Sequence, residues 1–379
     1  MKPLSPAHIA AIAPYQPGKP IDELRREMSA LGAAWPAEGA VKLASNENPL
    51  GVSPLALEAM AKAALHVSRY PDAGSFELRD KLARHHRIDR DQVIVGSGSN
   101  ELINLAVQVF CADGDAVLTP HHQFLCYRLA AEAFARPLQL SDNDPGFQLS
   151  VDKLLTAVTP ATKVVFLANP NNPTGAYLPA DEIARLVREL PQEIVLVLDE
   201  AYVEYCDAPD YRDALPLLAT RERFMLFRTF SKIHGLAGLR IGYGLSHKPL
   251  IELMNRVRLP FNVGSIAQAG AMAALDDAGH LSAARQLNSL ERVRVGAQLE
   301  RRGFTVFPSQ GNFVLVKVPA PFSGATLYTA LLHRGVIVRP LAPYRMLEHV
   351  RISIGTEAEN DRLLDELDVV LVAPTAAVH

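Results

Sequence analysis

The sequence predicts an α/β protein in which a large doubly wound domain, with a mostly parallel sheet, is joined to a smaller α/β domain. Apolar runs at 164–168, 194–198 and 224–227 show no alternation with polar residues. Such runs are typical of strands buried on both faces, as in a parallel sheet that helices cover. From Pro54 to about Leu259, helical and strand-like runs alternate, which is the pattern of doubly wound folds. A chain of 379 residues, 49% of them hydrophobic, is long enough for two domains.

The predicted domains follow one another along the chain, and the N-terminal segment returns to the smaller one. We expect residues 1–50 to form an N-terminal arm and part of the small domain, 51–262 the large domain and 263–379 the small C-terminal domain. Within the last range, residues 281–301 predict a long amphipathic helix whose arginines face water. Apolar runs predict strands of the small domain at 313–318, 336–338 and 350–354.

Composition excludes several classes of function. The net charge of −3 argues against a nucleic-acid surface and against a polybasic membrane contact. No apolar stretch is long enough to span a bilayer, and no secretory signal follows Met1. The three cysteines are odd in number and scattered, so we expect no disulfide framework and a reducing cytoplasm. The histidine pairs at 85–86 and 121–122 lack the spacing of a metal site, so we expect no metal.

Each of the three central apolar runs leads into a polar cluster. The first leads into Asn169–Gly175, the second into Asp199–Tyr202, and the third, through Arg228-Thr229-Phe230, into Ser231-Lys232. Ligands of open α/β sheets bind at the carboxyl ends of the strands. We therefore expect the three clusters to meet at one site.

Lys232 and its neighbours are the most informative of these residues. The lysine provides an amine that can form an imine with an aldehyde. Thr229, Ser231 and Arg240 provide hydroxyl groups and a guanidinium that can hold a phosphate. Pyridoxal phosphate is an aldehyde and a phosphate in one molecule, so the combination predicts this cofactor.

The other two clusters supply what the cofactor ring needs. Asp199 can pair with the protonated pyridine nitrogen, and Tyr202 and Asn172 can donate hydrogen bonds to the phenolic oxygen. Lys232 can then move a proton between carbon atoms. Each residue alone has an ordinary explanation, such as a helix cap, a buried tyrosine, a turn asparagine or a surface lysine. Their occurrence together in this order favours the cofactor site.

The phosphate is predicted to bind where a strand at 93–95 leads into Gly96–Leu102. The glycines permit a tight turn, and the free N–H groups of Ser99 and Asn100 at a helix start attract an anion. A dinucleotide site is the rival interpretation, but Glu101 takes the place of the third glycine. A simple strand–helix turn would also explain this segment on its own.

Together these motifs resemble the fold-type I, pyridoxal-phosphate-dependent aminotransferases of class I/II. The stretch from Thr229 to Tyr243 is very specific for that group, and Asn169–Gly175 and Asp199–Tyr202 match it in order and spacing. Within the group, the chain most resembles histidinol-phosphate aminotransferases. The resemblance extends from Pro14 to Thr356.

The resemblance implies a homodimer with shared active sites. Tyr70 corresponds to the residue that reaches the cofactor phosphate of the neighbouring subunit, and Phe124 to the aromatic ring that stacks on the pyridine. Many relatives have tyrosine instead of Phe124. Substrate residues are implied as well: Tyr15 and Asn46 in segments that close over the substrate, and Arg351, with Arg339 nearby, for its acidic group.

The implied reaction is transamination of L-histidinol phosphate with 2-oxoglutarate, giving imidazole acetol phosphate and glutamate in L-histidine biosynthesis. Two arginines can hold a phosphate, and also the carboxylates of glutamate, with forked hydrogen bonds. The loop Tyr344–Leu347 departs from the common pattern, and its Arg345 adds a positive charge. Three alternatives stay open: an aromatic amino-acid aminotransferase that uses Arg351 for a carboxylate, a phosphorylated amino-acid decarboxylase, and a non-catalytic module of a transcription regulator. The last needs a DNA-binding domain, for which we expect no room before the arm.

Overall fold

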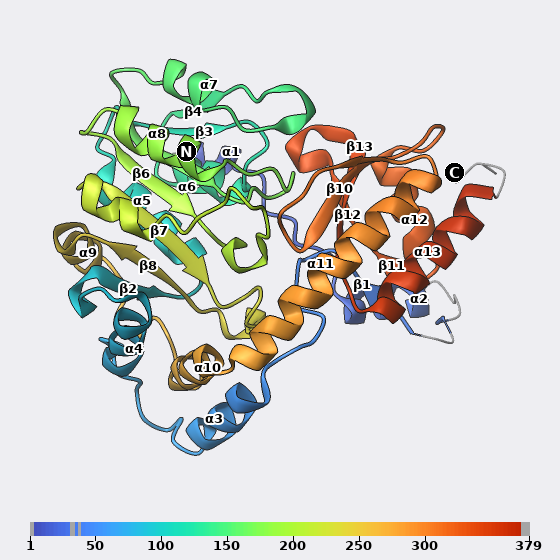
Figure 1. Ribbon diagram of the computed structural model, residues 1–379, viewed down its shortest axis with the longest axis horizontal. Coiled ribbons are helices and arrows are strands. Elements are labelled where there is room, and N and C mark those ends of the chain that lie inside the picture. The colour runs from blue at the N-terminus through green and yellow to red at the C-terminus, as the bar shows by residue number, and fades with distance from the viewer. Residues whose placement is uncertain (1–3, 31–34, 37–38, 373–379) are drawn as a thin grey trace.

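The computed structural model describes residues 4–30, 35–36 and 39–372. The remaining residues of the predicted arm and of the C-terminal domain lie outside the described ranges. Figure 1 shows two bodies, a larger one around a central sheet and a smaller one that contains both β1 (Val41–Lys42) and the C-terminal helix. The long helix α11 (Ala278–Arg301) runs from the larger body into the smaller one (Figure 1).

The large domain is built on a seven-stranded sheet of order β2-β8-β7-β6-β5-β3-β4. Neighbouring strands from β4 to β7 are parallel, while β8 is antiparallel to both β7 and β2. The prediction of an α/β fold with a mostly parallel sheet is confirmed. The strands are β2 (Val93–Gly96), β3 (Ala116–Pro120), β4 (Leu138–Ser141), β5 (Thr162–Ala168), β6 (Val195–Asp199), β7 (Phe224–Thr229) and β8 (Gly242–Ser246).

Both faces of this sheet are covered, which explains why its strands are apolar throughout. In β5, Val165 and Leu167 belong to the core on one face, and Val164 and Phe166 to the core on the other. Alternate side chains of a strand point to opposite faces, so a strand buried twice is apolar at every position. The helices of this domain are α3 (Pro54–Ala64), α4 (Phe76–His86), α5 (Ser99–Phe110), α6 (Leu125–Ala133), α7 (Val151–Thr156), α8 (Ala180–Glu189), α9 (Lys248–Asn255) and α10 (Ser265–Asp276).

Helix α10 packs against α3, and its alanines join the core that also contains Ala56 of α3. By this packing α10 belongs with the large domain, whereas the boundary predicted at residue 262 placed it in the small one. Its buried face is made of small residues, and a side chain at Gly270 would come within 2.9 Å of Met60 Cγ. Small residues permit this close approach of two helices, but they give little hydrophobic signal in the sequence.

The small domain contains a four-stranded antiparallel sheet of order β12-β13-β10-β9, and a parallel pair of β1 with β11. Through β1, and through Leu24 and Met28 of α2, the segment before residue 50 packs on this domain. Helix α1 instead contacts α6 of the large domain. The elements are α1 (Ala7–Ala11), α2 (Ile21–Ala30), β9 (Thr305–Phe307), β10 (Phe313–Lys317), α12 (Gly324–Leu332), β11 (Val336–Ile337), β12 (Arg339–Leu341), β13 (Met346–Ser353) and α13 (Glu357–Val372). No helix in the described part of the chain is long and apolar enough to cross a membrane.

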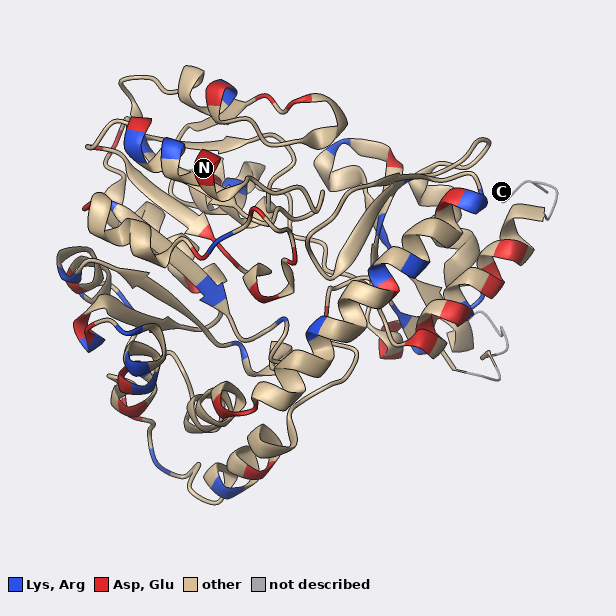
Figure 2. Cartoon of the chain, in the orientation of Figure 1, with Lys and Arg blue, Asp and Glu red and all other residues tan. Residues whose placement is uncertain are grey.

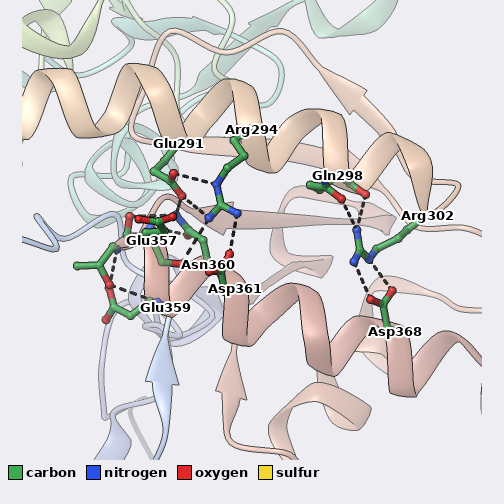
Figure 3. Close-up of polar contacts among 11 residues, drawn as sticks. Glu291, Arg294, Gln298, Arg302, Glu357, Glu359, Asn360, Asp361 and Asp368 are labelled. Atoms are coloured by element: carbon green, nitrogen blue, oxygen red, sulfur yellow. Dashed lines mark hydrogen bonds and ion pairs between the residues drawn. The ribbon is translucent and has the colours of Figure 1, made fainter.

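Charged side chains join α11 to its neighbours. Figure 2 shows basic residues along α11 and acidic residues along α13, and Figure 3 shows polar contacts between the two helices. The expectation that the arginines of α11 face water is wrong for Arg292, which is buried and donates to both oxygens of Asp207 at 2.8 and 2.9 Å. A charge pattern alone does not say which side of a helix another element will cover.

Asn360 is buried within the group of contacts around Glu291 in Figure 3. Its Nδ2 donates to Glu291 Oε2 at 2.7 Å and to the carbonyl of Gly355 at 3.1 Å, and its Oδ1 accepts from the Gly355 N–H at 2.9 Å. We predict that Asn360→Ala lowers the free energy of unfolding by about 2–3 kcal/mol, because buried partners are left unpaired. Asp368→Ala, which breaks an exposed pair with Arg302, should cost less than about 1 kcal/mol. Urea denaturation of both variants measures the difference, and equal losses would contradict this account.

Candidate active site

A cavity of about 600 Å³, including space open to solvent, lies at the carboxyl ends of β5, β6 and β7. All predicted cofactor residues except Tyr70 line it. The strands are neighbours in the sheet, so the residues that follow them meet although they are far apart in sequence. The lining residues are Ser99, Asn100, Phe124, Tyr127, Ala168, Pro170, Asn172, Asp199, Ala201, Tyr202, Thr229, Ser231, Lys232 and Arg240.

Asp199 ends β6 and is held by hydrogen bonds to both carboxylate oxygens. The Tyr127 hydroxyl donates to Oδ2 at 2.9 Å, and the Ala201 N–H donates to Oδ1 at 3.2 Å. Burial raises the pKa of Asp199 to about 6, and the two hydrogen bonds oppose that rise. A cationic group placed against this carboxylate would stabilise its charged form.

Tyr127 was not predicted from the sequence. It lies on α6 one helical turn after Phe124, and its ring stacks on Phe166 with centroids 4.8 Å apart. Residues three apart share a helix face, so a side chain three positions after Phe124 is expected near the cofactor ring. This spacing is the one signal in the sequence that could have indicated Tyr127.

Lys232 follows β7 and points its amine toward the segment after β1. Nζ donates to the carbonyl of Ser45 at 3.1 Å and lies 5.6 Å from the centre of the Tyr202 ring. Burial, and after it the positive charge of Arg351, lowers the pKa of Lys232 to about 7. The amine therefore loses its proton close to neutral pH, as a nucleophile requires.

The other end of the cavity combines a helix start with a guanidinium group. Helix α5 begins at Ser99, as predicted, and the residue before it, Gly98, has a φ of 74°. The backbone angle favours glycine at this position, and a Cβ there would lie 2.6 Å from Arg240 Nη2 and displace the guanidinium. Arg240 Nη1 donates to Ser231 Oγ at 3.3 Å. The helix start, the guanidinium and the hydroxyl thus surround one region of positive potential.

Arg339 and Arg351 face each other across the strand pair β12–β13. Like charges placed directly opposite destabilise a sheet unless an anion lies between them. Neither guanidinium forms an ion pair with a carboxylate in the described part of the chain. Arg351 is buried and donates to Asn172 Oδ1 at 2.6 Å and to the carbonyl of Ala44 at 2.7 Å. Arg351 thus adjoins the cavity through Asn172.

Asn46 and Tyr15 lie beside these arginines. Asn46 Nδ2 donates to the Tyr202 hydroxyl at 2.9 Å, and its Oδ1 accepts from Ser353 Oγ at 2.9 Å. The guanidinium of Arg339 lies 6.0 Å from the centre of the Tyr15 ring and donates to the carbonyl of Gln16. All four predicted substrate residues therefore lie next to the cavity or next to one another.

Tyr70 is the predicted site residue that the structure does not bring to this cavity. Its side chain is 83% exposed, and its ring stacks on Phe261 with centroids 4.6 Å apart. If Tyr70 contacts a cofactor, it must therefore do so in the active site of another copy of the chain.

Comparison with known proteins identifies the family. Residues 38–367 match the family model described as aminotransferase class I and II. The chain is 43% identical to histidinol-phosphate aminotransferase 2 of Nitrosospira multiformis, over 97% of this chain and 92% of the relative. It belongs to the histidinol-phosphate aminotransferase family. The histidinol-phosphate aminotransferase of an Anaeromyxobacter species is 44% identical over 98% of this chain and 100% of its own length.

A solved structure agrees with this membership. The crystal structure of histidinol-phosphate aminotransferase from Sinorhizobium meliloti in complex with pyridoxal-5'-phosphate matches with a TM-score of 0.87 and 28% identity, covering 97% of each chain. The predicted resemblance to class I/II aminotransferases is thereby confirmed, and the chain is an aminotransferase of fold type I.

We predict that the Lys232 amine of the cofactor-free protein titrates near pH 7, whereas a lysine in water does so near pH 10.4. Reductive methylation with formaldehyde over a range of pH, read by mass spectrometry, measures the titration of this residue. Arg351→Gln should move the midpoint to higher pH, because a positive charge near the amine is removed. A midpoint near pH 10 in the unchanged protein would show that the amine is not perturbed.

Proposed function

We propose that this chain catalyses transamination of L-histidinol phosphate with 2-oxoglutarate, giving imidazole acetol phosphate and glutamate in L-histidine biosynthesis. The observation that best supports this substrate is the facing pair Arg339 and Arg351, beside the cavity that contains Lys232. The names of the relatives, which are histidinol-phosphate aminotransferases, support it independently.

Pyridoxal phosphate fits the residues of the cavity. Asp199 would pair with the pyridine nitrogen, Phe124 would cover the ring face, and the Lys232 amine would hold the aldehyde. The phosphate would be held by Ser99, Asn100, Thr229, Ser231 and Arg240. When bound, the cofactor supplies an electron sink for the charge that develops at the substrate carbon.

Hydrogen bonds fix which groups can donate to the cofactor's phenolic oxygen. Tyr202 accepts from Asn46, so its own O–H remains free to donate. Asn172 accepts from Arg351 through Oδ1, so its NH₂ group remains to donate. Asn46 and Arg351, which are proposed to bind substrate, thus also orient the two residues proposed to bind the ring.

Lys232 is proposed to move the proton. Its amine, with a pKa of about 7, can accept a proton from the substrate carbon and return it to a neighbouring carbon. The buried carboxylate of Asp199 favours the protonated pyridine nitrogen, since the two opposite charges stabilise each other in a site of low polarity.

The arginine pair is proposed to bind the phosphate in one half-reaction and carboxylates in the other. Two guanidinium groups suit a dianionic phosphate, and forked hydrogen bonds suit a carboxylate equally well. An aromatic amino acid offers a single carboxylate and would leave one arginine unpaired. A phosphorylated amino-acid decarboxylase would use the same pair, but the structural neighbour of that kind is 21% identical and bears on the fold alone.

A homodimer with shared active sites completes the proposal. Exposed apolar side chains gather on α3, on the segment that follows it, and around Leu253 to Phe261. Exposed Tyr70 lies among them and stacks on Phe261, so a second copy that covered this face would receive Tyr70 at its own cofactor phosphate. We also place the enzyme in the cytoplasm, which accords with the free thiols of Cys111, Cys126 and Cys206.

We predict that Arg351→Gln and Arg339→Gln each lower kcat/KM for histidinol phosphate by about 30-fold or more, because truncating a charge pair costs roughly 2 kcal/mol or more. Steady-state kinetics with histidinol phosphate measure the loss. Arg301→Gln, at the exposed end of α11, removes the same charge far from the site and serves as the matched control. Normal kcat/KM in both site variants would contradict the assignment of the phosphate to this pair.

The shared site can be tested by mixing two inactive subunits. Lys232→Ala lacks the amine, and Tyr70→Ala lacks the side chain proposed to act across the dimer. A hybrid dimer would then have one intact site, so random re-association should restore about a quarter of wild-type activity. If Tyr70 acted within its own subunit, the hybrid would have no intact site and the mixture would stay inactive.

A further inference from the structure

A second cavity adjoins the active site on the other side of Phe124, whose ring lines both. It has a volume of about 690 Å³, including space open to solvent. Its walls are the end of β3, the start of α6, part of β4 and the 3₁₀ turn Ala342–Tyr344 with Arg345 after it. Arg339 and Arg351 do not line it, so it is distinct from the proposed substrate contacts.

Two positive charges line this cavity without a counter-charge. Arg128, half-buried on α6, and Arg345, which is exposed, form no side-chain hydrogen bond or ion pair with any described residue. None of the residues that line the cavity is acidic. His121, which also lines it, has its ion-pair partner Asp142 at 3.8 Å, and Asp142 is not among the lining residues. In a chain of net charge −3, this is a local concentration of positive charge.

Buried hydrogen-bond groups in the same wall also lack partners. Thr119 and Gln123 are only 4% and 5% exposed, yet Thr119 Oγ1 and Gln123 Nε2 have no partner among the described residues. The Gln123 amide is fixed, because its Oε1 accepts from the Ala168 N–H at 2.7 Å. Its NH₂ group is therefore a donor without an acceptor, which costs about 1–3 kcal/mol when it is left unmet.

The start of α6 adds to the same electrostatic pattern. The helix has nine residues, begins at Leu125, and receives no side-chain cap from Phe124. Its first N–H groups and the positive end of its dipole lie at the wall that Leu125 and Arg128 form. Unpaired guanidinium groups, fixed donors and an uncapped helix start all favour the same type of ligand, a small anion.

We propose that this second cavity binds a small oxyanion with two negative charges, of the phosphate class. Arg128 and Arg345 would balance its charge, and Thr119 Oγ1 and Gln123 Nε2, which lie just beneath the cavity surface, would donate hydrogen bonds to its oxygens after a small shift of the wall. The shared ring of Phe124 makes the site a direct neighbour of the cofactor cavity. The inference does not depend on the proposed transamination, because it concerns binding alone.

Isothermal titration calorimetry of the cofactor-loaded enzyme with inorganic phosphate tests the proposal. We expect wild-type enzyme to bind two phosphates, one at Arg339 and Arg351 and one in this cavity, and Arg128→Gln/Arg345→Gln to bind the second at least about 10-fold more weakly, as the loss of two charge-assisted contacts requires. Arg301→Gln, an exposed and distant arginine, controls for the general effect of charge and should bind as wild type does. Two phosphates bound by the double variant at wild-type strength, or no second phosphate bound by the wild type, would overturn the proposal.

Two further experiments test the contact with Thr119 and the chemical class of the anion. Thr119→Val keeps the shape and charge of the cavity but removes a hydroxyl, so we expect several-fold weaker binding of phosphate. Unchanged binding by this variant would place the anion elsewhere. Succinate serves as a dicarboxylate probe of similar charge. If succinate bound more tightly than phosphate and the double variant lost that binding, the phosphate class would be overturned in favour of a carboxylate.

Discussion

The ion pair between Arg228 and Glu200 holds together the part of the sheet on which the active site depends. Arg228 Nε and Nη2 donate to Glu200 Oε2 at 2.9 and 2.7 Å, and the Tyr211 hydroxyl donates to Oε1 at 3.1 Å. Both charged side chains are buried, so the pair must offset a large desolvation cost through these hydrogen bonds. Glu200 follows Asp199 and Arg228 precedes Thr229, so the pair fixes two neighbouring strand ends that line the cavity.

Much of the site could be predicted from the sequence because its residues follow strands. The strand pairs β5–β6 and β6–β7 are parallel, so the residues after them lie at one edge whatever the details of packing. Tyr127 and Arg228 could not be predicted in the same way. Tyr127 reaches Asp199 only because α6 crosses that edge of the sheet. The role of Arg228 becomes clear only from its ion pair with Glu200, which the sequence does not show.

The parts of the fold that were wrongly predicted share a physical reason. Helix α10 packs through small residues, which have weak hydrophobic patterns, and Arg292 is buried by a loop that is distant in sequence. In both cases a segment distant in sequence determines which side chains are buried. The local sequence pattern carries no information about that segment. The domain limits other than that of α10 stay predictions, and so do the roles given to single residues.

The substrate proposal and the second cavity both rest on arginines that lack a carboxylate partner. Arg339 and Arg351 face each other beside Lys232, and Arg128 and Arg345 line the space behind Phe124, in both cases without carboxylate partners in the described chain. Arg339 and Arg351 are buried, and a buried charge without a counter-charge is costly, whereas Arg128 is half-buried and Arg345 is exposed. An anionic ligand would offset this cost at the buried pair and would provide a counter-charge at the second pair.

The most direct measurement compares histidinol phosphate with histidinol, which differs only in the phosphate, as amino donors to the cofactor-loaded enzyme. The absorbance of the bound cofactor during a single half-reaction gives the concentration at which each donor acts, and phenylalanine serves as a third donor. If the facing arginines bind the phosphate, histidinol phosphate should act at a concentration about 100-fold lower than histidinol. Equal response to histidinol, or a stronger response to phenylalanine, would contradict the central claim.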